Sequence, residues 1–426
     1  MNRVETFYPF YKSSKGISID SRKIEEGQIF VAIKGERFDG HSFVEDVIKR
    51  GASKVVIDNP DFEVEGKTFL VADSLRFLQE LAIYHRRQFN VPVMALTGSN
   101  GKTTTKELLS AVLSRKYKVY ATKGNYNNHI GVPLTILDIQ DDAEFILIEM
   151  GANHIGDIES LCHIAEPEFG LITNIGTAHI EGFGSKEGIL IGKTELYRWV
   201  ASVNGTLFYS PSDDLLTNAL PEGVRSVPFS NDLQKADGPA YTLSIQDAEG
   251  KVYDTQLYGD YNFKNMEAAY SVGLYFGVDS YEAMQALSTY DPQMNRSQVI
   301  NKETCTLIMD AYNANPSSME LAIEALDKAE NIKKKVLILG DMYELGEDEI
   351  QYHKDILAAI SSGNWEAVFL VGKKFGQADE ANRYTHFDNV DDMQSSWPEI
   401  AHTFNGATIL LKASRSIGLE KLKPLF

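Results

Sequence analysis

The sequence contains almost no cysteine, and this shortage excludes two kinds of stabilisation. Cys162 and Cys305 are the only cysteines among the 426 residues, and they form no Cys-x-x-Cys pair. We therefore expect neither a disulfide framework nor a cysteine metal site. So few thiols fit a reducing compartment, and the predicted location is the cytoplasm.

The sequence also lacks a long hydrophobic run and an export signal. No stretch reaches the roughly 18 uncharged apolar residues that a membrane-spanning helix needs. The first eight residues read MNRVETFY and contain charges where a signal peptide has its apolar segment. We expect no membrane insertion.

Positive charge is scarce, with 41 Lys and Arg against 60 Asp and Glu and a formal net charge of −19. A chain this acidic is repelled by nucleic acid unless a local basic face compensates. The lysine run at residues 333–335 is more simply a solvated helix end. We expect no nucleic-acid partner, and any anionic substrate must be held by a few well-placed cations and by backbone amides.

The length exceeds that of one ordinary domain, and no internal repeat or low-complexity segment is present. We predict an α/β protein of three domains, at residues 1–88, 89–292 and 293–426. In the first, short β-type runs at 28–32, 54–57 and 68–71 accompany an amphipathic helix at 75–87. This pattern predicts a small α/β domain.

The second and third domains alternate strand and helix. In the second, apolar strands at 91–97, 145–149 and 169–174 and a helix at 103–114 predict a mostly parallel sheet covered on both faces. A hairpin at 241–258 is expected to add antiparallel strands to that sheet. In the third, strands at 306–309, 335–339, 367–371 and 408–411 and helices at 317–329 and 350–360 predict a Rossmann-like domain.

The strongest local motif is TGSNGKTT at residues 97–104, which leaves a predicted strand and opens a predicted helix. Glycines allow backbone N–H groups to approach a polyphosphate, and the helix N-terminus favours negative charge. The alternative is a chance glycine-rich turn, since the first glycine of the general phosphate-loop pattern would fall at Leu96. Lysine is expected on the β- and γ-phosphates of ATP and the next threonine on Mg²⁺. The predicted nucleotide contacts in the loop are Gly98, Asn100, Gly101, Lys102, Thr103 and Thr104.

With further segments in the same order, this loop resembles the Mur ligase family, which also uses the shortened phosphate loop. The segments are NYNN at 125–128, GVPLT at 131–135, IEMGA at 148–152, NIGTAH at 174–179, DAYNANP at 310–316 and LGDMYELG at 339–346. The resemblance is greatest to the members that add D-alanyl-D-alanine to a cell-wall precursor.

Two side chains are candidates for a metal site. Glu149 ends one predicted strand and His179 lies just past another, so both should project at the same sheet edge as the loop. Carboxylate oxygen suits Mg²⁺, and histidine is tolerated. A structural histidine is the alternative reading. The resemblance implies that Glu149 and His179 hold a second Mg²⁺.

Lys193 follows His179 by 14 residues, on a helix predicted at 188–199. Its ordinary interpretation is a solvated helix lysine. The resemblance implies instead a lysine carbamylated by CO₂, which would offer the metal a carboxylate-like oxygen. The sequence leaves the modification open.

Three residues match family positions that contact ATP, namely Asn265, Arg296 and Asp310. Tyr261 stands where the family usually has histidine. From composition alone, Asn262 or Asn265 could cap a helix, and Arg296 and Asp310 could be part of an ordinary interdomain ion pair.

Other residues are candidates for substrate binding. In the first domain, Ser21, Arg22 and Asp39 lie in segments that resemble the family's UDP-recognition domain. Asn128 lies in the segment after the phosphate loop. In the last domain, Lys412, Ser414 and Arg415 could bind a peptide carboxylate or an acyl-phosphate, and a solvated basic cluster is the alternative.

The resemblance implies an ATP- and Mg²⁺-dependent ligase whose catalytic candidates are Lys102, His179, Lys193 and Arg296. The expected substrates are UDP-MurNAc-tripeptide, activated as an acyl-phosphate, and D-Ala-D-Ala, whose amine attacks it. One alternative is the family branch that adds a diamino acid to the dipeptide precursor, although its usual Asp-Asn-Pro-Arg tetrapeptide is missing from the sequence. Another is a P-loop ATPase without ligase activity. We expect a monomer.

Overall fold

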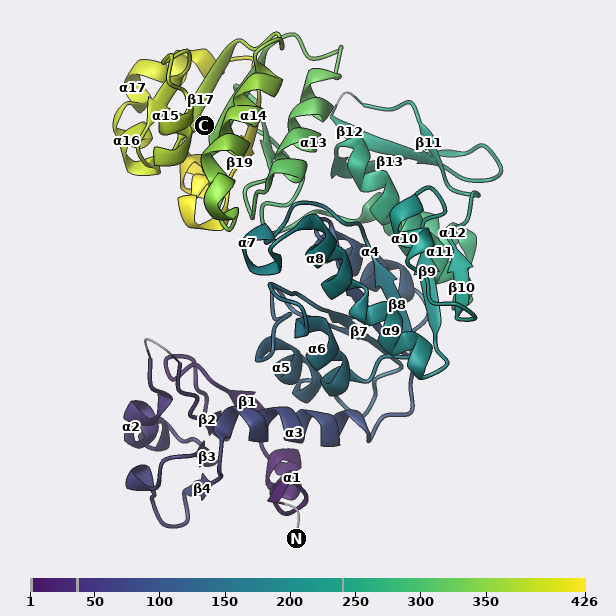
Figure 1. Ribbon diagram of the computed structural model, residues 1–426, viewed down its shortest axis with the longest axis vertical. Coiled ribbons are helices and arrows are strands. Elements are labelled where there is room, and N and C mark those ends of the chain that lie inside the picture. Colours follow the sequence, from purple (N-terminus) through teal and green to yellow (C-terminus); the bar gives the residue numbers. More distant parts are fainter. Residues whose placement is uncertain (1–2, 36–37, 240) are drawn as a thin grey trace.

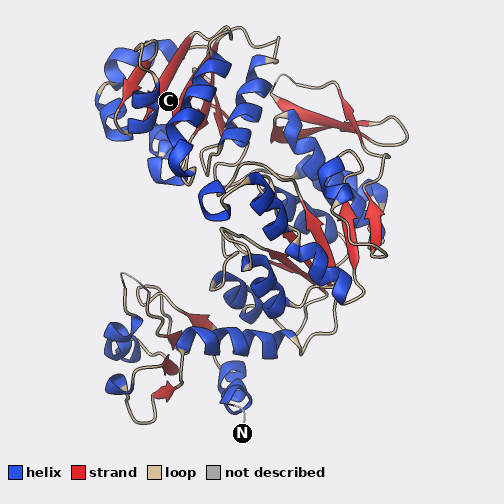
Figure 2. Ribbon diagram, in the orientation of Figure 1, coloured by secondary structure: helices blue, strands red, loops and turns tan. Residues whose placement is uncertain are grey.

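Three separate β-sheets, each accompanied by helices, divide the chain into three α/β domains that lie along an arc (Figure 1). The computed structural model describes residues 3–35, 38–239 and 241–426. Helices cover the sheets of the central and C-terminal domains on both faces (Figure 2). The predicted α/β class with three domains is confirmed. In the described part of the chain, no helix has both the length and the apolar character that crossing a bilayer requires.

The N-terminal domain contains a small parallel sheet with the strand order β1-β2-β3-β4. The helix α3 begins where the Asp73 carboxylate accepts a hydrogen bond from the Arg76 N–H, and it buries Phe77, Leu78 and Leu81. The sequence pattern did not predict α1, whose Phe7 is fully buried against Phe77. The elements are α1 (Arg3–Ser13), β1 (Ile17–Ser18), β2 (Ile29–Val31), η1 (Gly40–Phe43), α2 (Val44–Lys49), β3 (Lys54–Ile57), η2 (Pro60–Phe62), β4 (Thr68–Leu70) and α3 (Ser74–Arg86).

The central domain contains a wholly parallel six-stranded sheet with the order β10-β9-β8-β5-β7-β6. Every residue of β5 and β7 is buried, as expected of inner strands of a doubly covered sheet. Its elements are β5 (Val93–Thr97), α4 (Lys102–Leu113), β6 (Val119–Ala121), α5 (Gly131–Leu137), β7 (Phe145–Glu149), α6 (Asp157–Ala165), β8 (Phe169–Ile172), α7 (Ile180–Phe183), α8 (Lys186–Lys193), α9 (Glu195–Ser202), β9 (Thr206–Tyr209), α10 (Asp214–Asn218), β10 (Arg225–Pro228), η3 (Asp260–Asn262), α11 (Phe263–Tyr275) and α12 (Ser280–Thr289).

The strand order of the central sheet reverses at β5. The next strands along the chain, β6 and β7, lie on one side of β5, and β8 to β10 lie on the other. Parallel sheets bind ligands in the crevice that such a reversal opens at the carboxyl ends of the strands. The loop after β5, which carries the TGSNGKTT motif, lies at this point.

The predicted hairpin is present, but its assignment to the central sheet was wrong. Its strands β12 (Thr242–Gln246) and β13 (Val252–Tyr258) continue the C-terminal sheet, because β13 pairs antiparallel with β14 through Leu257 and Gln298. The hairpin nevertheless packs apolar side chains onto the α4, α11 and α12 core of the central domain. It therefore connects the two domains.

The C-terminal sheet has the order β11-β12-β13-β14-β15-β19-β16-β17-β18, antiparallel up to β15 and parallel beyond it. The parallel part is the predicted Rossmann-like unit. Its further elements are β11 (Gln234–Ala236), β14 (Gln298–Asn301), β15 (Thr306–Met309), α13 (Pro316–Asp327), β16 (Lys335–Gly340), η4 (Gly346–Asp348), α14 (Glu349–Ile360), β17 (Ala367–Val371), α15 (Lys373–Ala378), β18 (Thr385–Phe387), α16 (Val390–Ser395), α17 (Trp397–Ile400), η5 (Ala401–Phe404), β19 (Thr408–Lys412), η6 (Arg415–Ile417) and η7 (Leu419–Leu425).

Candidate active site

A cavity of 1220 Å³ lies between the central and C-terminal domains. Its walls come from the loop between β5 and α4, the carboxyl ends of β7 and β8, the start of α11 and the loop between β15 and α13. Most of the predicted site residues line it, namely Asn100, Gly101, Lys102, Thr103, Thr104, Asn128, Glu149, His179, Asn265, Arg296, Asp310 and Lys412.

The phosphate loop needs glycine at two positions. Gly98 and Gly101 have φ values of 146° and 78°, which side chains rarely adopt. A Cβ atom at Gly98 would lie 1.9 Å from Thr173 Oγ1, and one at Gly101 would lie 2.7 Å from Asn265 Oδ1. Gly101 is the N-cap of α4 and provides no side-chain cap, so the N–H groups of the first turn are available to an anion.

Lys102 is the cation that the phosphate-loop motif itself provides. Its half-buried Nζ donates hydrogen bonds to the carbonyls of Gly98 at 2.7 Å and Ser99 at 3.3 Å. Burial lowers the pKa of Lys102, and the charge of Arg296 lowers it further, whereas Glu149 opposes the shift. An anionic ligand would stabilise the protonated amine.

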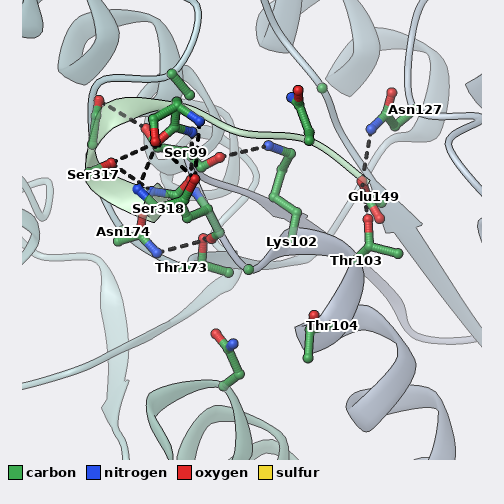
Figure 3. Close-up of a pocket in the computed structure, with 18 of the residues that line it drawn as sticks. Ser99, Lys102, Thr103, Thr104, Asn127, Glu149, Thr173, Asn174, Ser317 and Ser318 are labelled. Atoms are coloured by element: carbon green, nitrogen blue, oxygen red, sulfur yellow. Dashed lines mark hydrogen bonds between the residues drawn. The ribbon is translucent and has the colours of Figure 1, made fainter. Parts of the chain in front are cut away.

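Glu149 presents a free oxygen atom toward the loop. Its Oε1 accepts hydrogen bonds from Asn127 Nδ2 at 2.8 Å and Thr103 Oγ1 at 3.2 Å (Figure 3). Its Oε2 is buried and has no hydrogen-bond partner among the described residues. A buried, unsatisfied carboxylate oxygen beside a threonine hydroxyl fits a hard divalent cation such as Mg²⁺.

His179 lies at the edge of the same cavity, on the C-terminal-domain side. Its backbone is left-handed, with φ 59°, and it precedes α7. The ring Nδ1 lies 2.5 Å from Oε2 of Glu344 in the C-terminal domain, and this histidine lowers the pKa of Glu344. The described residues form no cluster of three or more His, Cys, Asp or Glu side chains that could hold a metal. Glu149 and His179 thus share a cavity without forming such a cluster.

Lys193 lies behind the cavity wall and is fully buried. Its Nζ has no hydrogen-bond partner in the described structure and lies 5.3 Å from the centre of the Phe183 ring. Burial lowers the pKa of Lys193 well below its usual range, and the charge of Lys102 adds to the shift. The alternative of a solvated helix lysine is therefore wrong.

The helix predicted at 188–199 is two helices, and Lys193 is the last residue of the first, α8. The break is at Thr194, whose hydroxyl donates hydrogen bonds to the carbonyls of Leu190 and Ile191. Such a bond to the preceding turn competes with regular helix geometry.

Asn265 supports the loop from α11. It accepts a hydrogen bond from Thr105 Oγ1 at 3.0 Å and donates one to Asn262 Oδ1 at 2.7 Å. Asn262 occupies the N-cap position of α11, but its side chain donates to the Tyr258 carbonyl and makes no capping bond. The alternative that Asn262 caps this helix through its side chain was therefore wrong.

Arg296 and Asp310 lie at the domain junction. The Arg296 guanidinium stacks 3.6 Å from the centre of the Tyr312 ring, and its Nε has no hydrogen-bond partner in the described residues. Asp310 accepts hydrogen bonds from the Ser297 N–H at 3.0 Å and from Lys412 Nζ. Asp310 therefore pairs with Lys412 of its own domain, and Arg296 offers free donors at the cavity.

The other predicted substrate residues occupy varied positions. Asn128 Oδ1 accepts hydrogen bonds from the Ile130 N–H at 3.2 Å and the Gly131 N–H at 2.8 Å, in the turn that precedes α5. Ser414 is buried and accepts from the Tyr343 N–H, and Arg415 pairs with Glu420 on the surface. Neither of these last two residues lines the cavity.

In the N-terminal domain, Ser21 is buried, Arg22 makes a two-point ion pair with Asp20, and Asp39 caps η1 and contacts His41. A second cavity of 1010 Å³ lies between the N-terminal and central domains. Ser21, Arg22 and Asp39 line neither cavity.

Sequence reasoning assigned no role to several polar residues that contact the phosphate loop. They are Thr173, Asn174, Asn315 and Ser317. Asn127, which donates to Glu149, also had no role assigned. Thr173 and Asn174 directly follow β8, so their place at the carboxyl edge of a parallel sheet was the available signal for these two. Asn315 and Ser317 lie at the start of α13, beyond the end of β15.

Comparisons with known proteins agree with this geometry. The family description "Mur ligase middle domain" matches residues 96–273, "Mur ligase, glutamate ligase domain" matches 295–415, and "Mur ligase family, catalytic domain" matches 13–94. The chain is 37% identical over 425 residues to the UDP-N-acetylmuramoyl-tripeptide–D-alanyl-D-alanine ligase of Bacillus subtilis, covering 96% of this chain and 92% of the relative. It is 31% identical to the Escherichia coli protein of the same name, covering 95% and 92%.

Solved structures with similar folds have related names. MurF from Acinetobacter baumannii superposes with a TM-score of 0.85 at 30% identity, covering 98% of this chain and 97% of that one. MurF ligase from Thermotoga maritima in complex with ADP gives 0.84 at 26% identity, covering 100% and 98%.

Proposed function

The chain belongs to the Mur ligase family, and from that premise we propose that it joins D-alanyl-D-alanine to UDP-N-acetylmuramoyl-tripeptide at the expense of ATP. It is an ATP-dependent amide ligase of peptidoglycan precursor synthesis. The observation that carries the assignment is the phosphate loop, which faces Glu149, Arg296 and Asp310 across one cavity.

The first step is transfer of the γ-phosphoryl group. An oxygen of the tripeptide's terminal carboxylate attacks the γ-phosphorus, the bond to the β-phosphate oxygen breaks, and an acyl-phosphate and ADP result. Free N–H groups of the first turn of α4 hold the phosphates, and Lys102 and Arg296 offset charge on the transferred group. Two anionic reactants meet here, so these cations are physically required.

The second step forms the amide bond. The free amine of D-Ala-D-Ala attacks the acyl carbon, and the tetrahedral intermediate collapses with loss of phosphate and of the amine proton. Lys412 and the rest of the C-terminal wall of the cavity would position the dipeptide, and the N-terminal domain would hold the UDP end of the precursor. Ser21, Arg22, Asp39, Ser414 and Arg415 would act only from the cavity margins or through rearranged domains.

The residues present fit Mg²⁺, as the unsatisfied Oε2 of Glu149 indicates. Thr103 would hold one ion, and Glu149 and His179, with Lys193 once carbamylated, would hold a second. When bound, Mg²⁺ neutralises phosphate charge. A cytoplasmic location is part of the proposal, since both ATP and the UDP-linked precursor are soluble. We also propose a monomer.

Lys193 suits carbamylation for a chemical reason. Only the neutral amine attacks CO₂, and burial lowers the pKa of Lys193, which favours that neutral form; its Nζ has no hydrogen-bond partner among the described residues. The product is an anionic carbamate, whose negative charge would be stabilised by the nearby positive charge of Lys102.

The test is phosphate release by the purified protein with ATP and Mg²⁺ and two reactant pairs. One pair is UDP-MurNAc-tripeptide with D-Ala-D-Ala, and the other is UDP-MurNAc-dipeptide with diaminopimelate or lysine. We expect release with the first pair alone, and a pentapeptide product by mass spectrometry. Release with the second pair would reassign the substrate, and release without any precursor would leave only an ATPase.

A further inference from the structure

Asn100, in the middle of the phosphate loop, uses all of its polar groups on other protein residues. Its N–H donates to Asn174 Oδ1 at 3.1 Å, and its carbonyl accepts from Thr173 Oγ1 at 2.6 Å and Asn174 Nδ2 at 2.9 Å. Its side-chain amide is turned toward the C-terminal domain. A residue predicted to contact nucleotide is therefore committed to contacts within the protein.

The side-chain amide belongs to a closed ring of three hydrogen bonds across the domain boundary. Asn315 Nδ2 donates to Asn100 Oδ1 at 2.7 Å, Asn100 Nδ2 donates to Ser317 Oγ at 3.0 Å, and Ser317 Oγ donates to Asn315 Oδ1 at 2.9 Å. Figure 3 labels Ser317 of the C-terminal domain together with Ser99 and Asn174 of the central domain, with dashed lines for the hydrogen bonds between the residues drawn. Each donor in the ring has one acceptor, so the three bonds support one another.

The ring joins the loop to a rigid part of the C-terminal domain. Asn315 is 7% exposed and is the N-cap of the twelve-residue helix α13, where it also accepts from the Ser318 N–H. The fit is close, because a Cβ atom added at Gly176 would lie 2.8 Å from Ser317 Oγ and 3.0 Å from Asn100 Nδ2. The position of α13 thus constrains the position of Asn100.

We propose that Asn100 is a positioning residue, held by Asn315 and Ser317, through which docking of the C-terminal domain fixes the phosphate loop in its nucleotide-binding conformation. Asn100 is followed directly by Gly101 and Lys102, so movement of its peptide would move the N–H groups and the lysine that meet phosphate. By linkage, docking that favours nucleotide binding is itself favoured by nucleotide to the same extent. The proposal takes from the proposed function only that this loop binds nucleotide.

The test is a double-mutant cycle on ADP binding, measured by calorimetry with Mg²⁺ and without any precursor. Ser317→Ala removes a ring member but leaves the Asn315 cap of α13 in place. We expect Asn100→Ala and Ser317→Ala each to weaken ADP binding about 3- to 10-fold, the effect of one or two hydrogen bonds. The double variant should be no weaker than Asn100→Ala, because both changes break the same ring. Unchanged ADP affinity in Ser317→Ala, or effects that multiply in the double variant, would overturn the proposal.

Two further variants separate positioning from general stability. Asn315→Ala and Asn389→Ala each remove an asparagine cap from a helix of the C-terminal domain, but only Asn315 contacts Asn100. We expect weaker ADP binding in the first alone. Gly176→Ala, which inserts a methyl group between the domains and removes no partner, should weaken ADP binding similarly. Equal ADP affinity in the two cap variants would contradict the proposal.

Turnover distinguishes this proposal from the ligase assignment. In Ser317→Ala the KM for ATP should rise about 3- to 10-fold while the KM for D-Ala-D-Ala stays constant. If no reactant pair supports turnover, the ligase assignment fails while the ADP cycle still tests the ring. A rise in both KM values by the same factor would indicate general disorder of the cavity and would count against Asn100.

Discussion

At the scale of single residues, the cavity is defined by groups whose charge or hydrogen-bonding capacity is not balanced by the protein. Glu149 Oε2 and Arg296 Nε are buried without hydrogen-bond partners among the described residues. Lys193 Nζ, which does not line the cavity, is also buried without such a partner. Unsatisfied buried charges reduce stability, so these groups at the site indicate ligands rather than structural roles.

Lys193 should carry a carbamate. With ¹³C-labelled bicarbonate, the wild-type protein should show a carbamate carbonyl resonance in its ¹³C spectrum, because burial lowers the pKa of Lys193 and so favours the neutral amine that reacts with CO₂. Lys193→Met should lack the resonance and lose most ligase activity. The exposed Lys186→Met, on the same helix, is the matched control and should retain both properties. A wild-type spectrum identical to that of Lys193→Met would exclude the modification.

Glu149→Gln removes a charge while keeping the acceptor for Asn127 and Thr103. We expect the Mg²⁺ concentration for half-maximal activity to rise at least about 10-fold, since a neutral amide is a weaker ligand for a hard cation. The melting temperature should change little or rise, because an unsatisfied buried charge is lost. Glu222→Gln, at an exposed site, controls for net charge. An unchanged Mg²⁺ dependence would remove Glu149 from the metal site.

At the scale of elements, strands were predicted well where they are short, apolar and inner. β7, β15 and β17 have the predicted bounds, because a continuous apolar run between polar turns is itself the signature of a buried parallel strand. The break between α8 and α9 was missed, since nothing in the local sequence shows that the Thr194 hydroxyl will bond backward. α1 was missed because its buried face is completed only by α3 and β4.

The buried His353 of α14 should make the stability of the C-terminal domain depend on pH. It accepts a hydrogen bond from the Met342 N–H at 3.0 Å and contacts the Glu349 carbonyl at 2.6 Å through Nδ1. Burial lowers the pKa of His353 from 6.5 to about 4, although Asp341 opposes the shift. Between those two values the unfolded chain binds the proton and the folded chain does not, so the free energy of unfolding falls as pH falls from 6.5 toward 4.

The loss should reach at most about 3 kcal/mol at pH 4 and then level off. Urea unfolding at a series of pH values measures it. His353→Gln should lower stability at pH 7 but flatten the pH dependence, whereas the exposed His402→Gln in the same domain should leave the wild-type curve. A pH profile in His353→Gln as steep as that of the wild type would place the titration elsewhere.

At the scale of the whole molecule, each domain has its own sheet, but the hydrophobic cores do not follow the same division into three. One continuous core joins α1 and α3 of the N-terminal domain to the helices α5, α6, α8 and α9 and one face of the central sheet. The C-terminal domain has its own two cores, one on each face of its sheet. The N-terminal and central domains share a hydrophobic core, whereas the central and C-terminal domains are held together by the hairpin and by polar contacts such as the ring around Asn100.

We therefore expect the N-terminal and central domains to unfold together and the C-terminal domain to unfold separately. The three tryptophans allow the test, because Trp199 lies in the central domain and Trp365 and Trp397 lie in the C-terminal domain. Urea transitions should differ between Trp199→Phe and the double variant Trp365→Phe/Trp397→Phe, since each retains one set of reporters. Saturating ADP should bring the two midpoints closer, because the nucleotide contacts both domains. Coincident midpoints without ADP would contradict the separation.

By itself, the sequence determined the α/β class, the phosphate loop and the family resemblance, because glycine conformation, apolar runs and motif order are properties of contiguous residues. Tertiary structure alone decided which sheet the hairpin joins, that Lys193 is buried without a partner, and that Asn100 bonds to Asn315 and Ser317. These features depend on which surfaces meet after folding. Burial and hydrogen bonds between residues more than 200 positions apart are set by the packing of whole domains, and no local pattern encodes them.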